Sequence, residues 1–253
     1  MRRIYFNLFS ITLFLLVISS CKKDIVKPGT GTAALTIVNC VAGNSKLLTN
    51  FNGTDLSGVK FYGQLNYVDP EWYLFTTNYS GQQKLGLYLA ADTSLNSNPL
   101  FNLKLNLPVN TMHTLFLMGT PQAPDTLFTK NKLPYHLPAD STMGIRFVNI
   151  SEGGNPVSVN LIGQADRYAI ANLPYKGATE FKHYTVRSTV DSYTFEFRDR
   201  ITDELLGSYT FDEVNASGSV ETGGNKWRNN NFTLALFGTQ ANKQVLMVME
   251  YFR

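Results

Sequence analysis

The chain has few of the residues on which catalytic and metal sites depend. Its 253 residues include three histidines and two cysteines, and charged residues make up only 16%. The histidines, His113, His136 and His183, are scattered, and no His-Glu-x-x-His or Cys-x-x-Cys motif occurs. We expect His113 to begin a strand and His136 to lie in a connecting segment, both in surface or turn positions. The sequence therefore predicts a protein without enzymatic activity, metal or cofactor.

Carboxylates offer one other route to acid and base chemistry. Asp199, Asp203 and Glu204 are close together in the chain and could act as a catalytic pair. The run that contains them, Arg198–Glu204, stands between two strand-like segments, where charged residues are typical of a hairpin turn. Neither a Gly-x-Ser-x-Gly motif nor a phosphate-binding loop is present to support catalysis. We therefore predict a turn at these residues.

Excess basic charge is also lacking. The formal net charge is +3, with 22 Lys and Arg against 19 Asp and Glu. Arg2 and Arg3 belong to an N-terminal segment that we expect to be removed, which leaves the remaining chain close to neutral. Proteins that hold nucleic acid neutralise several phosphates with clustered Lys and Arg. The composition therefore excludes nucleic acid as a partner.

Helical periodicity is missing after the N-terminal segment, where no window of eleven or more residues shows a convincing 3.6-residue repeat. Alternation of apolar and polar residues is common instead, as in Phe101–Leu107 and Tyr193–Arg198. Val245–Phe252 is apolar on both faces apart from Glu250, which predicts a strand covered on both sides. Frequent turn signals such as Asn52-Gly53 separate the runs. The pattern predicts an all-β fold of sandwich type.

The N-terminus carries the most specific local signal. A positive start, Met1–Arg3, is followed by an apolar stretch, Ile4–Ile18, that is short for a transmembrane helix and suits a targeting segment. Ile18-Ser-Ser-Cys21 resembles the lipobox of bacterial lipoproteins. That resemblance implies cleavage after residue 20 and lipid attachment at Cys21, so that the membrane is a partner through this lipid. An ordinary signal peptide and an uncleaved anchor are the alternatives.

Residues 21–32 are rich in Lys, Gly and Thr and are predicted to form a flexible tether. Lys22, Lys23 and Asp24 also resemble export signals that send some lipoproteins to the outer cell surface. We therefore expect an outer-membrane lipoprotein of the cell envelope, and both surface exposure and the periplasmic face remain open. With Cys21 acylated, Cys40 has no disulfide partner, and we expect it to be a small buried apolar residue.

An internal repeat organises the rest of the chain. The pattern of Leu35–Asn39 recurs at Ile145–Asn149, 110 residues later. That of Thr114–Thr120 recurs at Thr233–Thr239, 119 residues later. Between these matches, Lys84–Leu89 aligns with residues 193–198 at an offset of 109. Several matches in the same order indicate a duplication. We predict a first sandwich at 33–120 and a second at 143–253.

Four prolines interrupt the segment between the two copies. Because proline cannot donate a hydrogen bond to a ladder, residues 121–142 are predicted to be a connector rather than a strand. Leu127, Phe128 and Leu133 in this segment are expected to pack against at least one sandwich.

The Arg-Phe-Val-Asn opening at Arg146–Asn149, the Thr-Leu-Phe-Leu-Met-Gly strand at Thr114–Gly119 and the proline-containing bridge together resemble a family of exported bacterial proteins. This family is known as domain of unknown function 4397 and is often found in tandem on lipoproteins. The resemblance covers about residues 33–252. It implies two tandem Ig-like β-sandwich domains on the cell envelope, and it brings no established activity or catalytic residues.

Candidate ligand-binding residues come from the place where the copies differ. The change of offset puts about ten extra residues of the second copy within Val214–Asn231, a polar loop that contains Trp227 and Arg228. These side chains could stack on a sugar or a partner protein, or Trp227 could fold back as a plug over the end of the sandwich. Trp72 and Tyr73, near Tyr67 and Tyr79, form a second aromatic group, for which core packing is the alternative.

Two functions follow from these features. The first is a non-enzymatic, lipid-anchored envelope protein that presents two Ig-like domains for binding or adhesion to an unspecified partner. The second is an accessory carbohydrate-binding lipoprotein of a polysaccharide-uptake system, which the candidate aromatic residues Trp227, Trp72 and Tyr73 suggest. Either a glycan or a protein partner is compatible with the sequence.

Overall fold

A computed structural model describes residues 31–43, 46–56, 61–67, 73–94, 96–137, 139–187, 189–217 and 225–250. Every regular element among these residues is a strand, which confirms the predicted all-β fold. The chain divides into two compact units, Met1–Gly31 and Thr32–Arg253, and all of the strands belong to the second unit. Cys21 and the predicted tether up to residue 30 lie outside the described residues. The described part contains no helix with the length and apolarity needed to cross a membrane.

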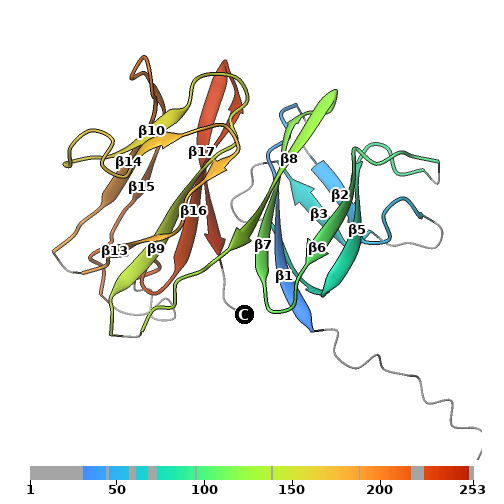
Figure 1. The fold of residues 1–253 in the computed structure, drawn as a ribbon, viewed down its shortest axis with the longest axis horizontal. Coiled ribbons are helices and arrows are strands. Elements are labelled where there is room, and N and C mark those ends of the chain that lie inside the picture. Colours follow the sequence, from blue (N-terminus) through green and yellow to red (C-terminus); the bar gives the residue numbers. More distant parts are fainter. Residues whose placement is uncertain are drawn as a thin grey trace, which may run out of the picture. The chain divides into compact units, whose positions relative to one another are not determined.

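The first copy is a sandwich of two four-stranded sheets (Figure 1). Its strands are β1 (Thr32–Asn39), β2 (Lys46–Asn50), β3 (Gly63–Asn66), β4 (Leu74–Tyr79), β5 (Gly81–Leu89), β6 (Phe101–Leu107), β7 (Met112–Thr120) and β8 (Ala123–Asn131). One sheet has the order β4-β1-β7-β8 and the other has the order β3-β2-β5-β6. Alternate residues of both sheets point into one shared core, among them Leu35, Leu87 and Leu117.

The second copy repeats this architecture. Its strands are β9 (Thr142–Asn149), β10 (Val157–Leu161), β11 (Ile170–Leu173), β12 (Gly177–Ala178), β13 (Lys182–Thr185), β14 (Tyr193–Asp199), β15 (Leu205–Phe211), β16 (Asn231–Thr239) and β17 (Asn242–Glu250). One sheet has the order β12-β9-β16-β17, with β13 also paired to β9, and the other has the order β11-β10-β14-β15. Phe147, Phe195, Phe197 and Leu234 lie in the core that these two sheets share.

The matched sequence segments occupy matched places in the two sheets. In both copies the opening strand pairs in parallel with the strand that holds the Thr-Leu segment, β1 with β7 and β9 with β16. Asn39 ends β1 and donates from Nδ2 to the carbonyl of Leu65 (3.4 Å), and Asn149 ends β9 and donates in the same way to Leu173 (3.2 Å). The repeated asparagine therefore ties the first strand of each copy to the opposite sheet.

Glycine recurs for a steric reason in the hairpin that closes each copy. Gly119 and Gly238 both have positive φ angles, +79° and +106°. A Cβ atom at either position would lie within about 2.3 Å of a carbonyl oxygen across the turn, that of Ala123 or Asn242. Only glycine avoids both the strained backbone and the clash, so this residue is required by the turn.

The structure shifts one predicted alignment by a single residue. Leu85 and Leu87 of β5 correspond to Phe195 and Phe197 of β14, because β2 and β10 hold them in the same register, so the offset is 110 rather than 109. An alignment at 109 would place apolar residues of one copy over polar residues of the other, since faces alternate along a strand. The prediction of the duplication holds, and the predicted register in this segment is wrong.

The predicted connector at residues 121–142 differs more from the structure. Residues 123–131 of the predicted proline-interrupted connector form β8, so the expectation that prolines exclude a strand is wrong there. β8 is the last strand of its sheet, and Pro124 pairs with Gly119 next to the hairpin turn, where a missing N–H leaves no internal ladder bond unmade. Residues 121–122 form the turn between β7 and β8, and the described residues among 132–141 form no strand and link the two sandwiches.

The two sandwiches pack against each other through equivalent faces. Their shared apolar cluster contains the matched pairs Val38 and Val148, Cys40 and Ile150, Phe116 and Ala235, and Met118 and Phe237, together with Leu246 and Val248 of β17. The other face of β17 contacts the core of its own sandwich through Val245, Met247 and Met249. The prediction of a strand covered on both sides is therefore confirmed for the described part of residues 245–252.

Candidate binding cleft and buried polar cluster

Trp227 is not available to a ligand, and its prediction as an exposed binding residue is wrong. Its side chain is 4% exposed and belongs to the core of the second sandwich. The ring meets Phe211 edge to face, with 5.0 Å between centroids, and Phe232 at 5.4 Å. Its indole N–H donates to the carbonyl of Asp212. Trp227 therefore acts as the plug that was the alternative interpretation.

The longer loop of the second copy lies where the change of offset placed it. Residues 212–230 connect β15 to β16, whereas residues 108–111 make the same connection in the first copy. Asn225 organises its described end, because its Oδ1 accepts from the backbone N–H groups of Trp227 (2.9 Å) and Arg228 (3.0 Å). The loop folds back over the sandwich because burial of the Trp227 and Val214 side chains in the core removes apolar surface from water.

The other predicted binding residues are not brought together. Arg228 is partly buried in the loop of the second sandwich, and its Nε has no hydrogen-bond partner. Tyr73 belongs to the first sandwich and packs against the apolar cluster between the sandwiches. Trp72 lies outside the described residues. The structure thus does not assemble Arg228 and Tyr73 into one site.

An open cleft of about 540 Å³ lies at the edge of the first sandwich. Two tyrosines at its rim are strongly exposed, Tyr62 at 61% and Tyr79 at 71%. The Tyr62 ring is held edge to face against Phe51 at 5.3 Å, and its hydroxyl accepts from Thr76 Oγ1 at 3.3 Å. The described lining residues are Thr32, Phe51, Asn52, Tyr62, Thr76, Thr77, Asn78, Tyr79 and Gln83.

Chain crossing between sheets creates this cleft. β4 belongs to one sheet and β5 to the other, and they are separated only by Ser80, so Tyr79 and Gln83 project near each other. Gln83 Nε2 donates to the Tyr79 carbonyl at 2.8 Å. Tyr79 was noted in the sequence only as a neighbour of Trp72, and Tyr62 was missed. A signal was present, because residues 73–83 contain no charged side chain although they form exposed strand ends.

All the side chains of the described residues that line the cleft are uncharged. Its polar groups are the hydroxyls of Thr32, Thr76 and Thr77 and the amides of Asn52, Asn78 and Gln83. The Nδ2 group of Asn78 is buried and has no hydrogen-bond partner. Such a group is rare in native proteins because an unmet donor loses its hydration without compensation. The lining can therefore donate and accept hydrogen bonds without favouring either charge.

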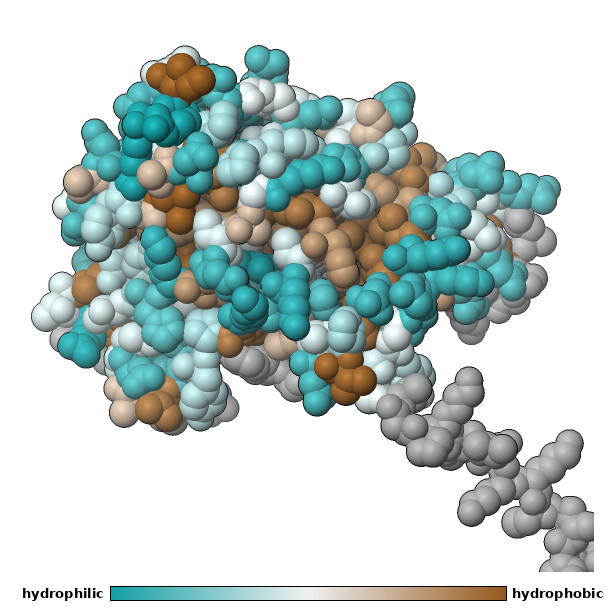
Figure 2. Space-filling model, in the orientation of Figure 1, coloured by the Kyte–Doolittle hydropathy of each residue, from teal (hydrophilic) through white to brown (hydrophobic). Residues whose placement is uncertain are grey.

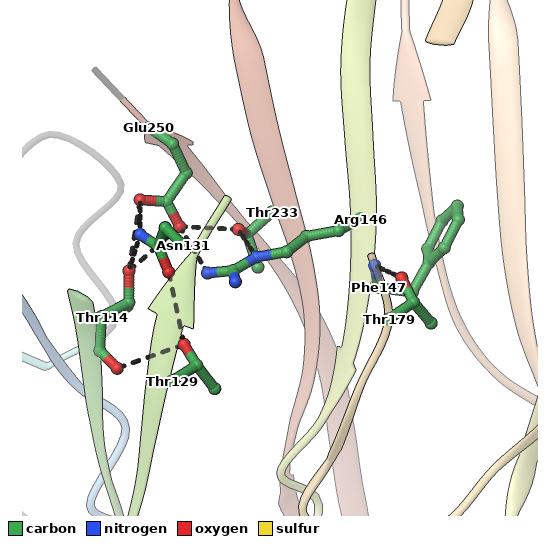
Figure 3. Close-up of polar contacts among 8 residues, drawn as sticks. All are labelled: Thr114, Thr129, Asn131, Arg146, Phe147, Thr179, Thr233 and Glu250. Atoms are coloured by element: carbon green, nitrogen blue, oxygen red, sulfur yellow. Dashed lines mark hydrogen bonds and ion pairs between the residues drawn. The ribbon is translucent and has the colours of Figure 1, made fainter. Parts of the chain in front are cut away.

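A second polar feature lies between the sandwiches. Arg146 and Glu250 form an ion pair of 2.8 Å, with side chains only 3% and 2% exposed (Figure 3). Glu250 also accepts from Thr233 Oγ1 at 2.7 Å, from Thr114 Oγ1 at 3.1 Å and from Asn131 Nδ2 at 2.9 Å. Arg146 Nε donates to Thr233 Oγ1 at 2.8 Å. Both buried charges are therefore satisfied by partners from the two sandwiches.

The two repeats supply matched residues to this buried polar cluster, which consists of Thr114, Asn131, Arg146, Thr233 and Glu250. Thr114 matches Thr233, and Asn131 matches Glu250, at the offset of 119. Burial lowers the pKa of Arg146, and the carboxylates of Glu250 and Glu180 act against that shift. Nothing in the cluster opens onto the cleft lining, so we interpret it as the polar centre of the interface between the sandwiches.

Two predicted surface histidines are buried, which corrects the sequence interpretation. His113 stacks on Phe128 with 4.7 Å between ring centroids, and its Nε2 lies 2.9 Å from Thr111 Oγ1. His136 lies between Thr142 Oγ1 and Asn231 Oδ1, at 2.9 and 3.0 Å. Phe128 and Asn231, on β8 and β16, are far from these histidines in the sequence, and such long-range contacts are not visible in local periodicity.

Two other sequence predictions are confirmed. Cys40 is buried and free, and burial raises the pKa of its thiol to about 12. Asp199 organises a hairpin turn, because its Oδ1 accepts from the backbone N–H groups of Ile201 (2.8 Å) and Thr202 (2.9 Å). These bonds lower the pKa of Asp199 against the opposing effect of burial. Within the described residues, no group of three or more His, Cys, Asp or Glu could hold a metal ion.

Apolar side chains also reach the surface. On the face drawn in Figure 2 they gather in the middle of the molecule, with polar side chains around them. Strongly exposed apolar side chains occur on both sandwiches, for example Val109 on the first and Ile162 and Ile201 on the second. Such surface can contribute to contacts with another macromolecule.

The fold and the cleft define an all-β protein of two packed sandwiches with an uncharged, tyrosine-rimmed cleft. No protein-family model matches the chain, and no curated protein matches it. Functional inference therefore rests on the residues themselves.

Proposed function

We propose that this is a non-enzymatic, lipid-anchored cell-envelope protein that presents two Ig-like sandwiches for binding. The main support is the open cleft of about 540 Å³, which combines exposed tyrosine rings with hydroxyl and amide groups. A cleft of this size with a few convergent polar groups is typical of ligand sites. The contacts between the sandwiches support the proposal further, because an apolar cluster and a buried polar cluster join the two sandwiches.

The lipid anchor is proposed from the sequence, on the lipobox-like Ile18–Cys21 and the apolar stretch before it. The described strands begin at Thr32, eleven residues after Cys21. A fully extended chain spans at most about 3.6 Å per residue, so the start of β1 would lie within about 40 Å of the lipid. Thr32 also lines the cleft. The proposed anchor would therefore keep the cleft close to a membrane surface, which we propose is that of the outer membrane.

Replacement of Cys21 tests the anchor. Cys21→Ala in the full chain should move the protein from the membrane fraction to the soluble fraction and remove the lipid-sized increment from its intact mass. Cys40→Ala is the matched control, because it removes the other cysteine and should leave the protein in the membrane fraction. Membrane retention of Cys21→Ala equal to that of Cys40→Ala would contradict the proposal. Protease treatment of intact cells would then distinguish the outer surface from the periplasmic face.

The partner of this binding protein is either a macromolecule in adhesion or a carbohydrate in an uptake system. The exposed apolar residues on both sandwiches favour contact with a protein. The lining of the cleft favours a carbohydrate, because sugar rings present apolar C–H faces and many hydroxyl groups. A short distance to the membrane also suits capture of a soluble ligand better than contact with a distant cell. A glycan array probed with the full chain separates the two, since adhesion to a protein predicts no glycan signal.

A further inference from the structure

We propose that the cleft of the first sandwich binds an uncharged oligosaccharide, with the rings of Tyr62 and Tyr79 as its stacking surfaces. This inference rests on the proposed binding function and assigns that function a site and a ligand class. It replaces the loop around Trp227 and Arg228, which the sequence had favoured.

The two tyrosines are suited to stacking because both rings are exposed, and the ring of Tyr62 is also held in place. Tyr62 is fixed by the edge-to-face contact with Phe51 and by the hydrogen bond from Thr76. That hydrogen bond uses the Tyr62 oxygen as an acceptor and leaves its own O–H proton for a ligand. Tyr79 ends β4, and its backbone is fixed both by the ladder with Thr32 and by the bond from Gln83. Rigid aromatic rings lose little conformational entropy when a ligand stacks on them.

The polar groups of the cleft fit hydroxyl groups better than ions. None of the described lining residues carries a charge, so among them an acidic or basic ligand would lose hydration without gaining an opposite charge. Thr32 and Thr77 are exposed in the cleft, and each hydroxyl can donate to and accept from a sugar hydroxyl. One amide N–H of Gln83 donates to the Tyr79 carbonyl, and its Oε1 can accept a hydrogen bond from a ligand. Donors and acceptors are thus both present, as a hydroxyl ligand requires.

The site continues beyond the cleft, which points to an oligosaccharide rather than a single sugar. A second hollow of about 280 Å³ adjoins it and shares Thr32 and Thr77. Its remaining lining residues are also uncharged and consist of Ala33, Ala34, Asn110, Thr111 and Met112. Thr77 is exposed on the edge strand β4 between the two hollows. An extended chain of sugars could therefore occupy both hollows across the edge of the sheet.

The test uses the full-length protein in detergent on an array of neutral and acidic oligosaccharides, followed by calorimetric titration with the best neutral binder. Tyr79→Ala and Tyr62→Ala should each weaken that binding about tenfold or more, as expected for an aromatic anchor. Tyr168→Ala is the matched control, because Tyr168 is a similarly exposed tyrosine on the second sandwich. Binding should also be insensitive to salt, because no ion pair contributes. Circular dichroism of each variant checks that the fold is retained.

The outcomes separate the site from the function. Loss of binding in both cleft variants, with Tyr168→Ala unchanged, supports the inference. Binding of a neutral oligosaccharide that survives Tyr79→Ala and Tyr62→Ala overturns the cleft as the site and leaves a carbohydrate-binding function in place. Binding only of acidic glycans or of a protein overturns the ligand class while the binding function stands. Absence of any glycan signal overturns the inference.

Discussion

Removing one member of the buried Arg146–Glu250 pair should destabilise the protein severely, and removing both should not. Glu250→Leu leaves the Arg146 guanidinium almost fully buried with only Thr233 as a hydrogen-bond partner. An uncompensated buried charge costs about 3–5 kcal/mol of unfolding free energy. Arg146→Met leaves the Glu250 carboxylate buried and should cost a similar amount.

The double variant should lose far less than the sum of the single variants. With both charges replaced by apolar side chains, the remaining cost comes from Thr233, Thr114 and Asn131, whose polar groups lose their carboxylate partner. The Asn131–Thr114 hydrogen bond of 2.8 Å survives and limits this loss. We expect about 1–3 kcal/mol for the double variant, against about 6–10 kcal/mol if the two changes were independent. The coupling energy should therefore be at least about 3 kcal/mol.

Urea unfolding followed by circular dichroism and by tryptophan fluorescence measures all four corners of this cycle. The matched control is the cycle for Lys132 and Glu180, an exposed ion pair of 3.3 Å, for which the coupling should stay below about 1 kcal/mol. A cost of less than about 1 kcal/mol for Glu250→Leu, or a coupling energy equal to that of the control cycle, would refute the reasoning.

Two further predictions concern Trp227 and His113, whose burial differs from the positions predicted from the sequence. Trp227→Ala should destabilise the protein by about 3–5 kcal/mol in urea unfolding, because it empties a packed position between Phe211 and Phe232. It should leave binding by the cleft unchanged in calorimetry, and a selective loss of binding with normal stability would contradict its role as a plug. His113 makes stability depend on pH, because burial and then Lys130 lower its pKa below 6.5, although a hydrogen bond with Thr129 raises it. The unfolded chain then takes up the proton first as the pH falls below about 6.5, so unfolding free energy should be greatest above that pH and decrease below it. His113→Gln should flatten this part of the profile measured by thermal unfolding between pH 7.5 and 5, and an unchanged slope would contradict the assignment.

Much of the fold was predictable because strand faces alternate in the sequence. The period of two residues and the repeated Asn and Gly positions predicted sandwiches in duplicate, since both features act locally. Local signals were insufficient where tertiary context decides. Pro124 is tolerated only because β8 is at a sheet edge, and Trp227 is buried only because the loop folds back onto Phe232. Neither position can be deduced from neighbours in the chain.

The sequence contains a signal from which the buried ion pair of the polar cluster could have been predicted. Glu250 is a single charge in a strand predicted to be covered on both faces, and Arg146 is a single charge in the apolar start of the second copy. Buried charges need partners, so two such residues of opposite sign predict each other. The sequence signal of the cleft is weaker, because Tyr62 directly precedes β3 and Tyr79 ends β4, and only the three-dimensional fold brings them together.

Asn131 and Glu250 occupy matched positions at the centre of the interface but differ in charge. This difference determines which sandwiches can pair. Because the packing faces are equivalent, two second copies from different molecules could in principle meet in the same way. That arrangement would bring Glu250 against another Glu250, where the observed pair has Asn131 against Glu250. It would also remove the asparagine donor of the first copy. Like charges buried together are strongly unfavourable, so divergence of the repeats selects the neighbour in the same chain. Molecules at high local concentration would thereby be protected from exchanging sandwiches with one another.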